Sequence, residues 1–573
     1  MGIPRLVSTL EPYVIHGSLT DKRVVIDGPA LTYHILYICN RHGIPQPSYK
    51  LLGETAVAWL DELTQRGVSV DAIYFDAYLP PVKEPVRMQR MIKSLSQLKA
   101  SYSSDTNGFF PSYFSTADET TPILFSAAKP PQKLALPPSF HVPAIIDALK
   151  SSPSYTKLVI IVPGEADAYC AQHLSESGGM VLTSDSDLLV HNLGKGSAVF
   201  LRDIYLDEKS NLACASFSPA YICEKLKLAS PDEMCRFAYE RKCSPHSTLP
   251  QLLQDCVRPI TDQAGYTEFC HEYREHVVAH IPVSTSGKPV EIGSLDPRIS
   301  EMVLQFDSQN DQPHTMSNPK MFLPILLESP SRGSAWEQST PIRQLAYTVA
   351  RWIIPGSSST VQEYRRVNTP VQKGRQVSIL SEKAAKAWAQ DLVSLMTRIR
   401  TGTQGDTIVA WYILCLTLDI RHSHEWGKPS HPLQTLEDSS QTVPSKKVSW
   451  DILHFIAHLQ AAFYSFRLLK QIISLGHPQK ILPDLSDMLL SLPSLSEFPD
   501  VERTLSFLQR SSEARVYKTV SRLVPLPHAN IDAKPKRTVK DKKKRRVGQD
   551  NAPRRPSSSV KPASRNLFDV LSQ

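Results

Sequence analysis

The chain has 573 residues, of which 41% are hydrophobic, and this is enough for two or three domains with large buried cores. Its net charge of +8 is concentrated near the C-terminus, because residues 534–565 hold 13 Lys/Arg and 2 Asp/Glu, a net +11 that leaves about −3 for the rest. No run of 18 apolar residues and no apolar signal-peptide stretch occurs, so the composition argues against a membrane-spanning or secreted protein.

Short apolar runs separated by helical patterns predict a parallel sheet in the first part of the chain. The runs are 23–27, 72–76, 158–162, 180–182 and 198–201, the last of which we expect to close the sheet. Helices are expected at 30–40, 49–65, 142–150 and 166–175, and this alternation implies parallel pairing through right-handed crossovers. Residues 1–20 are expected to form a short helix and a turn.

Acidic residues follow the carboxyl ends of four of these runs. They are Asp27, Asp76, the pair Glu165 and Asp167, and the pair Asp185 and Asp187. The carboxyl ends of parallel strands meet along one edge of the sheet, where carboxylates repel one another unless a cation neutralises them. Hard oxygen ligands suit Mg²⁺ or Mn²⁺. One such acid often only caps a helix, but six of them predict a two-metal site for phosphodiester hydrolysis.

A basic segment follows the second acidic run. Lys83, Arg87, Arg90 and Lys93 come after Pro80-Pro81, and the last three are spaced three residues apart, which places them on one face of a helix. Cations beside a metal site stabilise the charge that develops on a phosphate. We therefore predict that these four residues contact nucleic acid, although a solvated helix face shows the same spacing.

Five stretches together resemble the flap-endonuclease/XPG nuclease family, and most of all its Asteroid branch. They are Met1–Leu6, the strand that ends at Asp27-Gly28, Phe75–Pro81, Pro163–Ala168 and Thr183–Asp187. The resemblance covers residues 1 to about 205, apart from a divergent insertion at about 99–138. It implies a PIN-like α/β domain that cuts branched or single-stranded DNA with two Mg²⁺ ions.

The same resemblance implies roles for individual residues. By position, the six acids match the metal-binding carboxylates of the family, and Lys83 and Arg90 match residues that contact the scissile phosphate. Gly2, after removal of Met1, matches an N-terminal glycine near that phosphate. The insertion at 99–138 matches an arch over the active site, and its aromatic residues are expected either to stack on unpaired bases or to pack against the domain.

The sequence departs from the family pattern further on. The family carries another aspartate pair in a Gly-x-Asp-Tyr context, which leads into a helix–hairpin–helix that grips duplex DNA. Residues 234–246 contain no Gly-Asp and no glycine-rich hairpin, and Glu240 is the available substitute. This difference leaves a second interpretation open, in which a PIN-like protein with weakened or lost turnover binds nucleic acid or partner proteins.

Neither His191 nor the cysteines are expected to carry chemistry. A lone histidine after a strand is more often a surface or hydrogen-bonded residue than a general base. The nine cysteines form no Cys-x-x-Cys pair, and the spacing of those at 214, 223, 235 and 243 is not typical of zinc sites, so we expect buried free thiols.

The second half of the chain has a helical pattern. Helices are expected at 342–354, 381–399, 407–420, 450–474 and 501–509, with a Pro/Ser-rich loop at about 422–447. We therefore predict three domains: a nuclease domain at 1–255, a mainly α-helical domain at 256–518, and a disordered basic tail at 519–573. Lys542–Arg546 is typical of a nuclear localisation signal or a nucleic-acid patch.

The sequence thus predicts a Mg²⁺- or Mn²⁺-dependent, structure-specific nuclease that acts on DNA in the nucleus. Protein partners are expected to dock on the helical domain and the tail, and no membrane association is expected. A phosphatase that uses Asp185 and Asp187 as a nucleophile pair is a weaker alternative, since such enzymes usually place this pair after the first strand.

Overall fold

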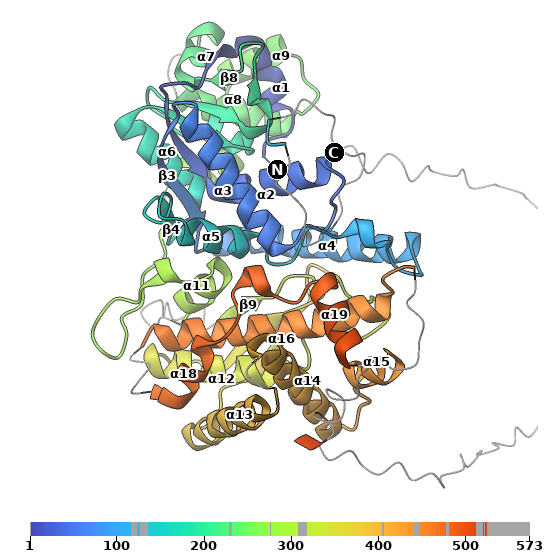
Figure 1. Ribbon diagram of the computed structural model, residues 1–573. Helices are drawn as coiled ribbons and strands as arrows, with labels where there is room; N and C mark the ends of the chain where they lie inside the picture. The colour runs from blue at the N-terminus through green and yellow to red at the C-terminus, as the bar shows by residue number, and fades with distance from the viewer. Residues whose placement is uncertain are drawn as a thin grey trace, which may run out of the picture. The chain divides into compact units, whose positions relative to one another are not determined.

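A mixed eight-stranded sheet organises the first half of the chain (Figure 1). The computed structural model describes residues 2–115, 123–125, 136–228, 232–274, 277–306, 318–403, 406–439, 446–476, 481–511, 520 and 522–523. By their contacts, the described residues all belong to one compact unit within residues 1–524. Within the described ranges no helix is both long and apolar enough to span a bilayer.

The strand order in this sheet is β1-β8-β6-β5-β2-β3-β4, and β7 pairs with β8. The strands are β1 (Ile15–Ser18), β2 (Arg23–Asp27), β3 (Ser69–Asp76), β4 (Val159–Val162), β5 (Met180–Thr183), β6 (Ser197–Phe200), β7 (Tyr205–Leu206) and β8 (Leu212–Phe217). The five strands from β6 to β4 run parallel, whereas β8 is antiparallel to β1 and β6. The predicted α/β fold with a parallel sheet is therefore confirmed.

Two expectations about the sheet were wrong. The strand at Ser197–Phe200 does not close it, because β7 and β8 follow, and residues 1–20 contribute strand β1 as well as a helix. The reason lies in the side chains. β8 reads Leu-Ala-Cys-Ala-Ser-Phe, with small residues in place of the β-branched ones that mark a strand, and all four residues of β1 are exposed.

Ten α-helices accompany this sheet. They are α1 (Leu6–Leu10), α2 (Gly28–Arg41), α3 (Tyr49–Gln65), α4 (Glu84–Ser104), α5 (His141–Ser151), α6 (Ala166–Ser177), α7 (Pro219–Leu226), α8 (Asp232–Cys243), α9 (Leu249–Val257) and α10 (Gln263–Arg274). Helices α2, α3 and α5 pack on one another. Helix α6 joins β4 to β5 in the opposite direction across the sheet, so a right-handed crossover places it on the other face.

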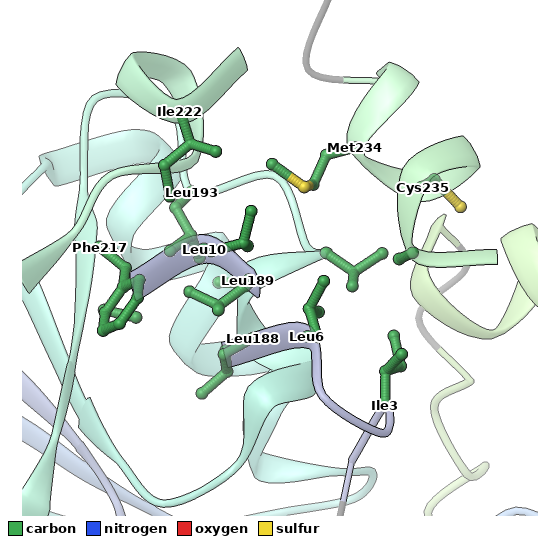
Figure 2. Close-up of a cluster of buried hydrophobic side chains, with 14 of the residues drawn as sticks. Ile3, Leu6, Leu10, Leu188, Leu189, Leu193, Phe217, Ile222, Met234 and Cys235 are labelled. Atoms are coloured by element: carbon green, nitrogen blue, oxygen red, sulfur yellow. The ribbon is translucent and has the colours of Figure 1, made fainter. Parts of the chain in front are cut away.

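A hydrophobic cluster holds the N-terminal segment against the sheet (Figure 2). Leu6 and Leu10 of α1 are fully buried among Leu188, Leu189 and residues of α7 and α8. Residues 188 and 189 belong to the short helical turn that follows β5. Because this turn also carries Asp187, packing of α1 fixes the start of the chain beside the acidic strand ends.

The second half is mainly helical, as predicted. Its α-helices are α11 (Pro297–Leu304), α12 (Thr340–Ile353), α13 (Glu382–Gly402), α14 (Thr407–Glu425), α15 (His431–Ser439), α16 (Trp450–Ser474), α18 (Pro483–Leu490) and α19 (Val501–Ser511). Helix α15 lies inside the expected Pro/Ser-rich loop. A small sheet, β11-β10-β9, was also missed; it consists of β9 (Lys320–Phe322), β10 (Thr360–Tyr364) and β11 (Arg375–Ser378).

The sheet region and the helical region touch through charged and aromatic pairs. Arg467 of α16 donates to both carboxylate oxygens of Asp147 on α5, at 2.7 and 2.9 Å. Phe140 stacks on Tyr464 of α16 with ring centroids 4.4 Å apart, and both rings are fully buried. A bidentate ion pair and a buried aromatic stack are both strong orienting contacts, so α16 and α5 hold one another in place.

The insertion at 99–138 is partly helical and packs its aromatic residues. Helix α4 continues to Ser104, Phe109 stacks on Tyr113 at 4.2 Å, and the same ring meets Trp450 of α16 at 5.3 Å. Trp450 also donates its indole N–H to the Asp105 carbonyl. Of the described aromatic residues, Tyr102, Phe109, Tyr113 and Phe114 pack against the protein, whereas Phe110 is exposed. Residues 116–122 and 126–135 of the insertion lie outside the described residues.

Candidate active site

Four adjacent parallel strands carry the six predicted acids at one edge of the sheet. In the order β5-β2-β3-β4, the register pairs Asp27 at the end of β2 with Tyr74, and Asp76 at the end of β3 with Val162. Glu165 and Asp167 follow β4, and the second of them lies in the first turn of α6. Asp185 and Asp187 follow β5. The structure therefore brings all six acids to the edge where the sequence places them.

Hydrogen bonds fix the orientation of three of these carboxylates. Asp27 accepts from the Ala30 backbone N–H at 3.1 Å and from the Thr183 hydroxyl at 2.7 Å. Asp76 accepts from the Ala166 N–H, the first residue of α6, at 2.6 Å, and Asp185 accepts from the Asp187 N–H at 3.1 Å. Helix N-termini supply two of these donors, so the positive ends of α2 and α6 face the acidic edge.

Burial and mutual repulsion raise the pKa of four of the acids. The pKa of Asp27 rises to about 7, mainly through burial and then through the charges of Asp76 and Asp185. The pKa of Asp187 also rises to about 7, again mainly through burial, with Asp185 adding to the effect. The pKa of Asp76 rises to about 6. Burial and all four neighbouring aspartates raise the pKa of Asp167 well above its usual value. Such a set is short of positive charge.

The residues present fit a divalent cation. All six donors are hard carboxylate oxygens, the class that Mg²⁺ and Mn²⁺ prefer. One oxygen of Asp187, Oδ1, is buried and has no hydrogen-bond partner among the described residues. An ionised carboxylate with an unpaired buried oxygen is costly unless a cation completes it. The same six acids would hold such a cation, and Asp187 is the one that most needs it.

Gly2 lies directly beside the acidic pair that follows β5. A Cβ atom at this position would stand 2.6 Å from Asp185 Oδ1 and 3.2 Å from Asp187 Oδ1, and the backbone φ of +109° is one that residues with side chains rarely adopt. The next residue, Ile3, donates its N–H to the Ser186 hydroxyl at 3.0 Å. Only glycine therefore permits this close approach of the backbone.

The four predicted cations occupy different environments. Lys83 lies in the acidic site, where its ammonium donates to Glu165 at 2.8 Å and pairs with Glu272 at 3.1 Å. Arg87 pairs with Glu301 of α11 and lies over the Phe322 ring at 4.8 Å, while its charge still acts to lower the pKa of Asp76. Arg90 and Lys93 are exposed on α4. A direct contact of Arg87 with nucleic acid would require it to leave two partners.

A cavity of about 650 Å³ opens beside the acids. One wall carries Lys83, Glu165, Asp167 and Asp187, and the opposite wall is α10. The cavity also contains Glu272 and Tyr273 of α10, which the sequence did not connect to the site, and His191, which was expected to carry no chemistry. The sequence gives little indication of the two α10 residues, because α10 follows no strand and matches no motif of the resemblance.

Glu272 brings a further carboxylate to the site. It shares Lys83 with Glu165, and its charge helps to raise the pKa of Asp187. Glu240 was the substitute expected from the sequence. Its carboxylate instead pairs with Arg236, which lies one turn earlier on α8, at 2.6 Å. Among the described residues, α10 and not α8 supplies the additional acid.

Comparisons with known proteins identify what this chain resembles. The family described as "XPG domain containing" matches residues 137–379, a range that includes Glu165, Asp167, Asp185, Asp187 and Glu272. The chain is also similar to "Asteroid homolog 1" of Schizosaccharomyces pombe, with 22% identity over 389 residues that span 65% of each chain. The predicted resemblance to the XPG family and its Asteroid branch is thereby confirmed.

Among solved structures, this chain matches "The catalytic core of Rad2 in complex with DNA substrate", with 13% identity and a TM-score of 0.25. The match covers 48% of this chain and 87% of the other. The similarity to the XPG family therefore rests on the sequence matches.

Proposed function

We propose that this protein is a Mg²⁺- or Mn²⁺-dependent nuclease that hydrolyses phosphodiesters in branched or single-stranded DNA. One observation carries this proposal: six carboxylates gather at four adjacent strand ends, Glu165, Asp167 and Asp187 among them line a cavity, and a buried oxygen of Asp187 lacks a partner among the described residues. The match to the XPG family supports the same function. The same six acids are the proposed metal ligands and catalytic residues.

The surrounding residues have roles that follow from their charge. Divalent ions, when bound, would neutralise phosphate charge and activate water at neutral pH. Lys83, at the rim of the acids, holds Glu165 in place and offers a cation to a phosphate oxygen. Arg90 and Lys93 on the exposed face of α4 bind the nucleic-acid backbone, and Gly2 lets a phosphate approach Asp185 closely.

A second candidate function is nucleic-acid binding with little turnover. It is favoured by the ion pairs of Lys83, which hold both Glu165 and Glu272 and so compete with a cation for two carboxylates. The absence of the family's last aspartate pair from the sequence points the same way. Under this alternative the acids bind metal and DNA, but hydrolysis is slow, and the helical region and the basic tail recruit partners.

Cleavage assays with a matched pair of variants distinguish these candidates. Full-length protein is incubated with Mg²⁺ or Mn²⁺ and with flap, overhang and single-stranded DNA. Asp185→Asn keeps the oxygen that accepts the Asp187 N–H but removes the charge, and cleavage should fall at least about 100-fold, the usual cost of losing one transition-state group. Glu208→Gln, an exposed acid after β7, is the control and should cleave like wild type.

Two other outcomes are informative. DNA binding that depends on Mg²⁺, without cleavage above the Asp185→Asn level on any substrate, supports the binding function. Equal cleavage by wild type and Asp185→Asn overturns the nuclease assignment. We further propose that the protein acts in the nucleus, on the basis of the Lys542–Arg546 run.

A further inference from the structure

Three histidine side chains meet in the helical region, away from the acidic site. His431 begins α15, and His454 and His458 lie four residues apart on α16, so their side chains lie on one face of that helix. One ring nitrogen of each lies within 4.8 Å of those of the other two. The sequence did not suggest this cluster, because the three positions span two helices and a connection that was expected to be a loop.

The distance within the α16 pair fits a metal ion. The Nε2 atoms of His454 and His458 are 3.3 Å apart. Two nitrogens bound to one tetrahedral Zn²⁺ at about 2.0–2.1 Å stand about 3.3 Å from each other. Two imidazoles that face each other through Nε2 can form at most one hydrogen bond, and a cation between them would satisfy both lone pairs.

Carboxylates stand behind each of the three rings. Asp419 of α14 lies 2.7 Å from His458 Nδ1, Glu328 lies 3.9 Å from His454 Nδ1, and Asp451 lies 3.6 Å from His431 Nε2. Metal-binding histidines commonly present their second ring nitrogen to a carboxylate, which fixes the tautomer and the ring orientation. At 2.7 Å, Asp419 favours a proton on Nδ1 of His458 and leaves its Nε2 to face His454.

Burial keeps His431 and His454 neutral and leaves the cluster short of hydrogen-bond partners. The Nδ1 atoms of all three histidines are buried and form no hydrogen bond among the described residues, although that of His458 lies 2.7 Å from Asp419. Burial is the largest cause that lowers the pKa of His431 to about 4, followed by the charges of His458 and Arg332. Burial also lowers the pKa of His454. Neutral imidazole is the form that binds a metal, and a metal bond to Nδ1 of His431 would offset the cost of leaving that buried nitrogen without a partner.

We propose that His431, His454 and His458 bind one Zn²⁺ ion that fastens α15 to α16. Three nitrogen ligands suit zinc and not magnesium, whose ligands are oxygens. The fourth position falls to water, since Asp451 faces Nε2 of His431 and pairs with Arg332. The cavity beside Asp419 and His458 measures about 10 Å³, room for one water and for no organic substrate, so the role is structural.

The metal content of the full-length protein tests this proposal without any variant. Protein purified without added metal and dialysed against Mg²⁺ should retain about one zinc per chain by elemental analysis. Replacement by Co²⁺ should give the visible absorption of a tetrahedral nitrogen and oxygen site. A strong chelator should lower the melting temperature, and Zn²⁺ should restore it. Zinc below about 0.1 per chain, with no uptake of equimolar Zn²⁺ or Co²⁺, overturns the proposal.

Variants then locate the ion. The double change His454→Asn and His458→Asn should remove zinc and abolish the effect of the chelator. His422→Asn is the matched control, since His422 is a buried histidine of α14 outside the cluster. Asp185→Asn should keep its zinc, which separates this site from the acidic one and makes the result independent of nuclease activity. Full zinc retention by the double variant places the ion elsewhere and overturns the assignment.

Discussion

At Asp27, Asp76 and Asp187, burial works against stability when no cation is bound. Each carboxyl has a raised pKa, so ionisation near neutral pH forces like charges together at the sheet edge. Proteins usually keep such mutually repelling buried carboxylates only at binding sites, where a ligand compensates their charge. The repulsion should therefore be measurable as a pH dependence of stability, independently of catalysis.

Stability of the metal-free protein should therefore fall as the pH rises from about 5 to about 8. An acid whose folded pKa is about 6 or 7 binds more protons folded than unfolded between its usual pKa near 4 and the raised value, so the free energy of unfolding declines across that window. Thermal melts with a chelator present measure this decline. Adding Mg²⁺ should raise the melting temperature more at pH 8 than at pH 5.5.

A charge-removing variant provides the control for this dependence. Asp187→Asn removes a repelling charge, so the metal-free variant should melt a few degrees above wild type at pH 8 and equally near pH 5. The variant should also gain less from Mg²⁺. A metal-free wild type that is as stable at pH 8 as at pH 5 would show that the acids are not short of positive charge.

At the scale of elements, α10 supplies what the sequence motifs lack. Glu272 reaches the acids through Lys83, whereas Glu240 of α8 is occupied by Arg236. We predict that Glu272→Gln lowers cleavage by about 10- to 100-fold, the range seen for groups that position metal ligands. Glu268→Gln, one turn earlier on α10 and in the same cavity, should change cleavage little.

Glu240→Gln completes this comparison. Because its carboxylate neutralises the buried Arg236 within α8, the change should lower stability and leave the rate unchanged. Cleavage rates of the three variants, measured side by side, show which of the two helices supplies the additional functional acid. A larger loss of cleavage with Glu240→Gln than with Glu272→Gln would assign that acid to α8.

Helix α4 carries two arginines that the sequence treats alike and the structure separates. Arg87 pairs with a carboxylate of α11 and covers Phe322, so it joins α4 to the second half of the chain. Arg90 is exposed. We predict that Arg87→Met lowers the melting temperature with little change in DNA affinity, while Arg90→Met weakens DNA binding several-fold at unchanged stability. Fluorescence anisotropy and thermal melts on the same samples would contradict this division if the two variants behaved alike.

The sequence predicts elements well where local pattern and topology agree. Helix α3 has the expected bounds, Tyr49–Gln65, because its apolar period is regular and Ser48 caps it. The strands that carry acids are short β-branched runs. Strand β8 was missed because its residues are small. Helix α10 was not connected to the site because nothing local in its sequence indicates that it lines the cavity beside Asp187. Contacts between distant segments leave no periodic signal.

For the whole molecule, the contacts between α16 and α5 join the sheet region, which holds the acidic site, to the helical region, which holds the proposed zinc site, in one compact unit within residues 1–524. Arg343 and Glu363, both fully buried and paired at 2.7 Å, add a charged contact within the helical region. Such buried pairs specify geometry more than they stabilise it. The remaining segment, residues 525–573, has 13 Lys and Arg against 4 Asp, a net charge of +9 in a chain whose total is +8.

The net positive charge of residues 525–573 predicts that this segment contributes to DNA affinity and not to the cleavage rate. Residues 534–565 carry a net +11, while the rest of the chain is slightly negative, so the tail supplies much of the attraction to phosphates. Removing residues 525–573 should weaken binding to single-stranded DNA at low salt. It should also flatten the dependence of log K on log salt by about 0.7 for each phosphate that the shortened protein no longer neutralises. The rate at saturating DNA should stay the same, because all the proposed catalytic residues lie within residues 1–524.

A variant with Lys542–Arg546 changed to glutamine should reproduce part of the loss of DNA affinity at constant chain length. An unchanged salt slope in both proteins would place the phosphate contacts on α4 and the cavity rim instead.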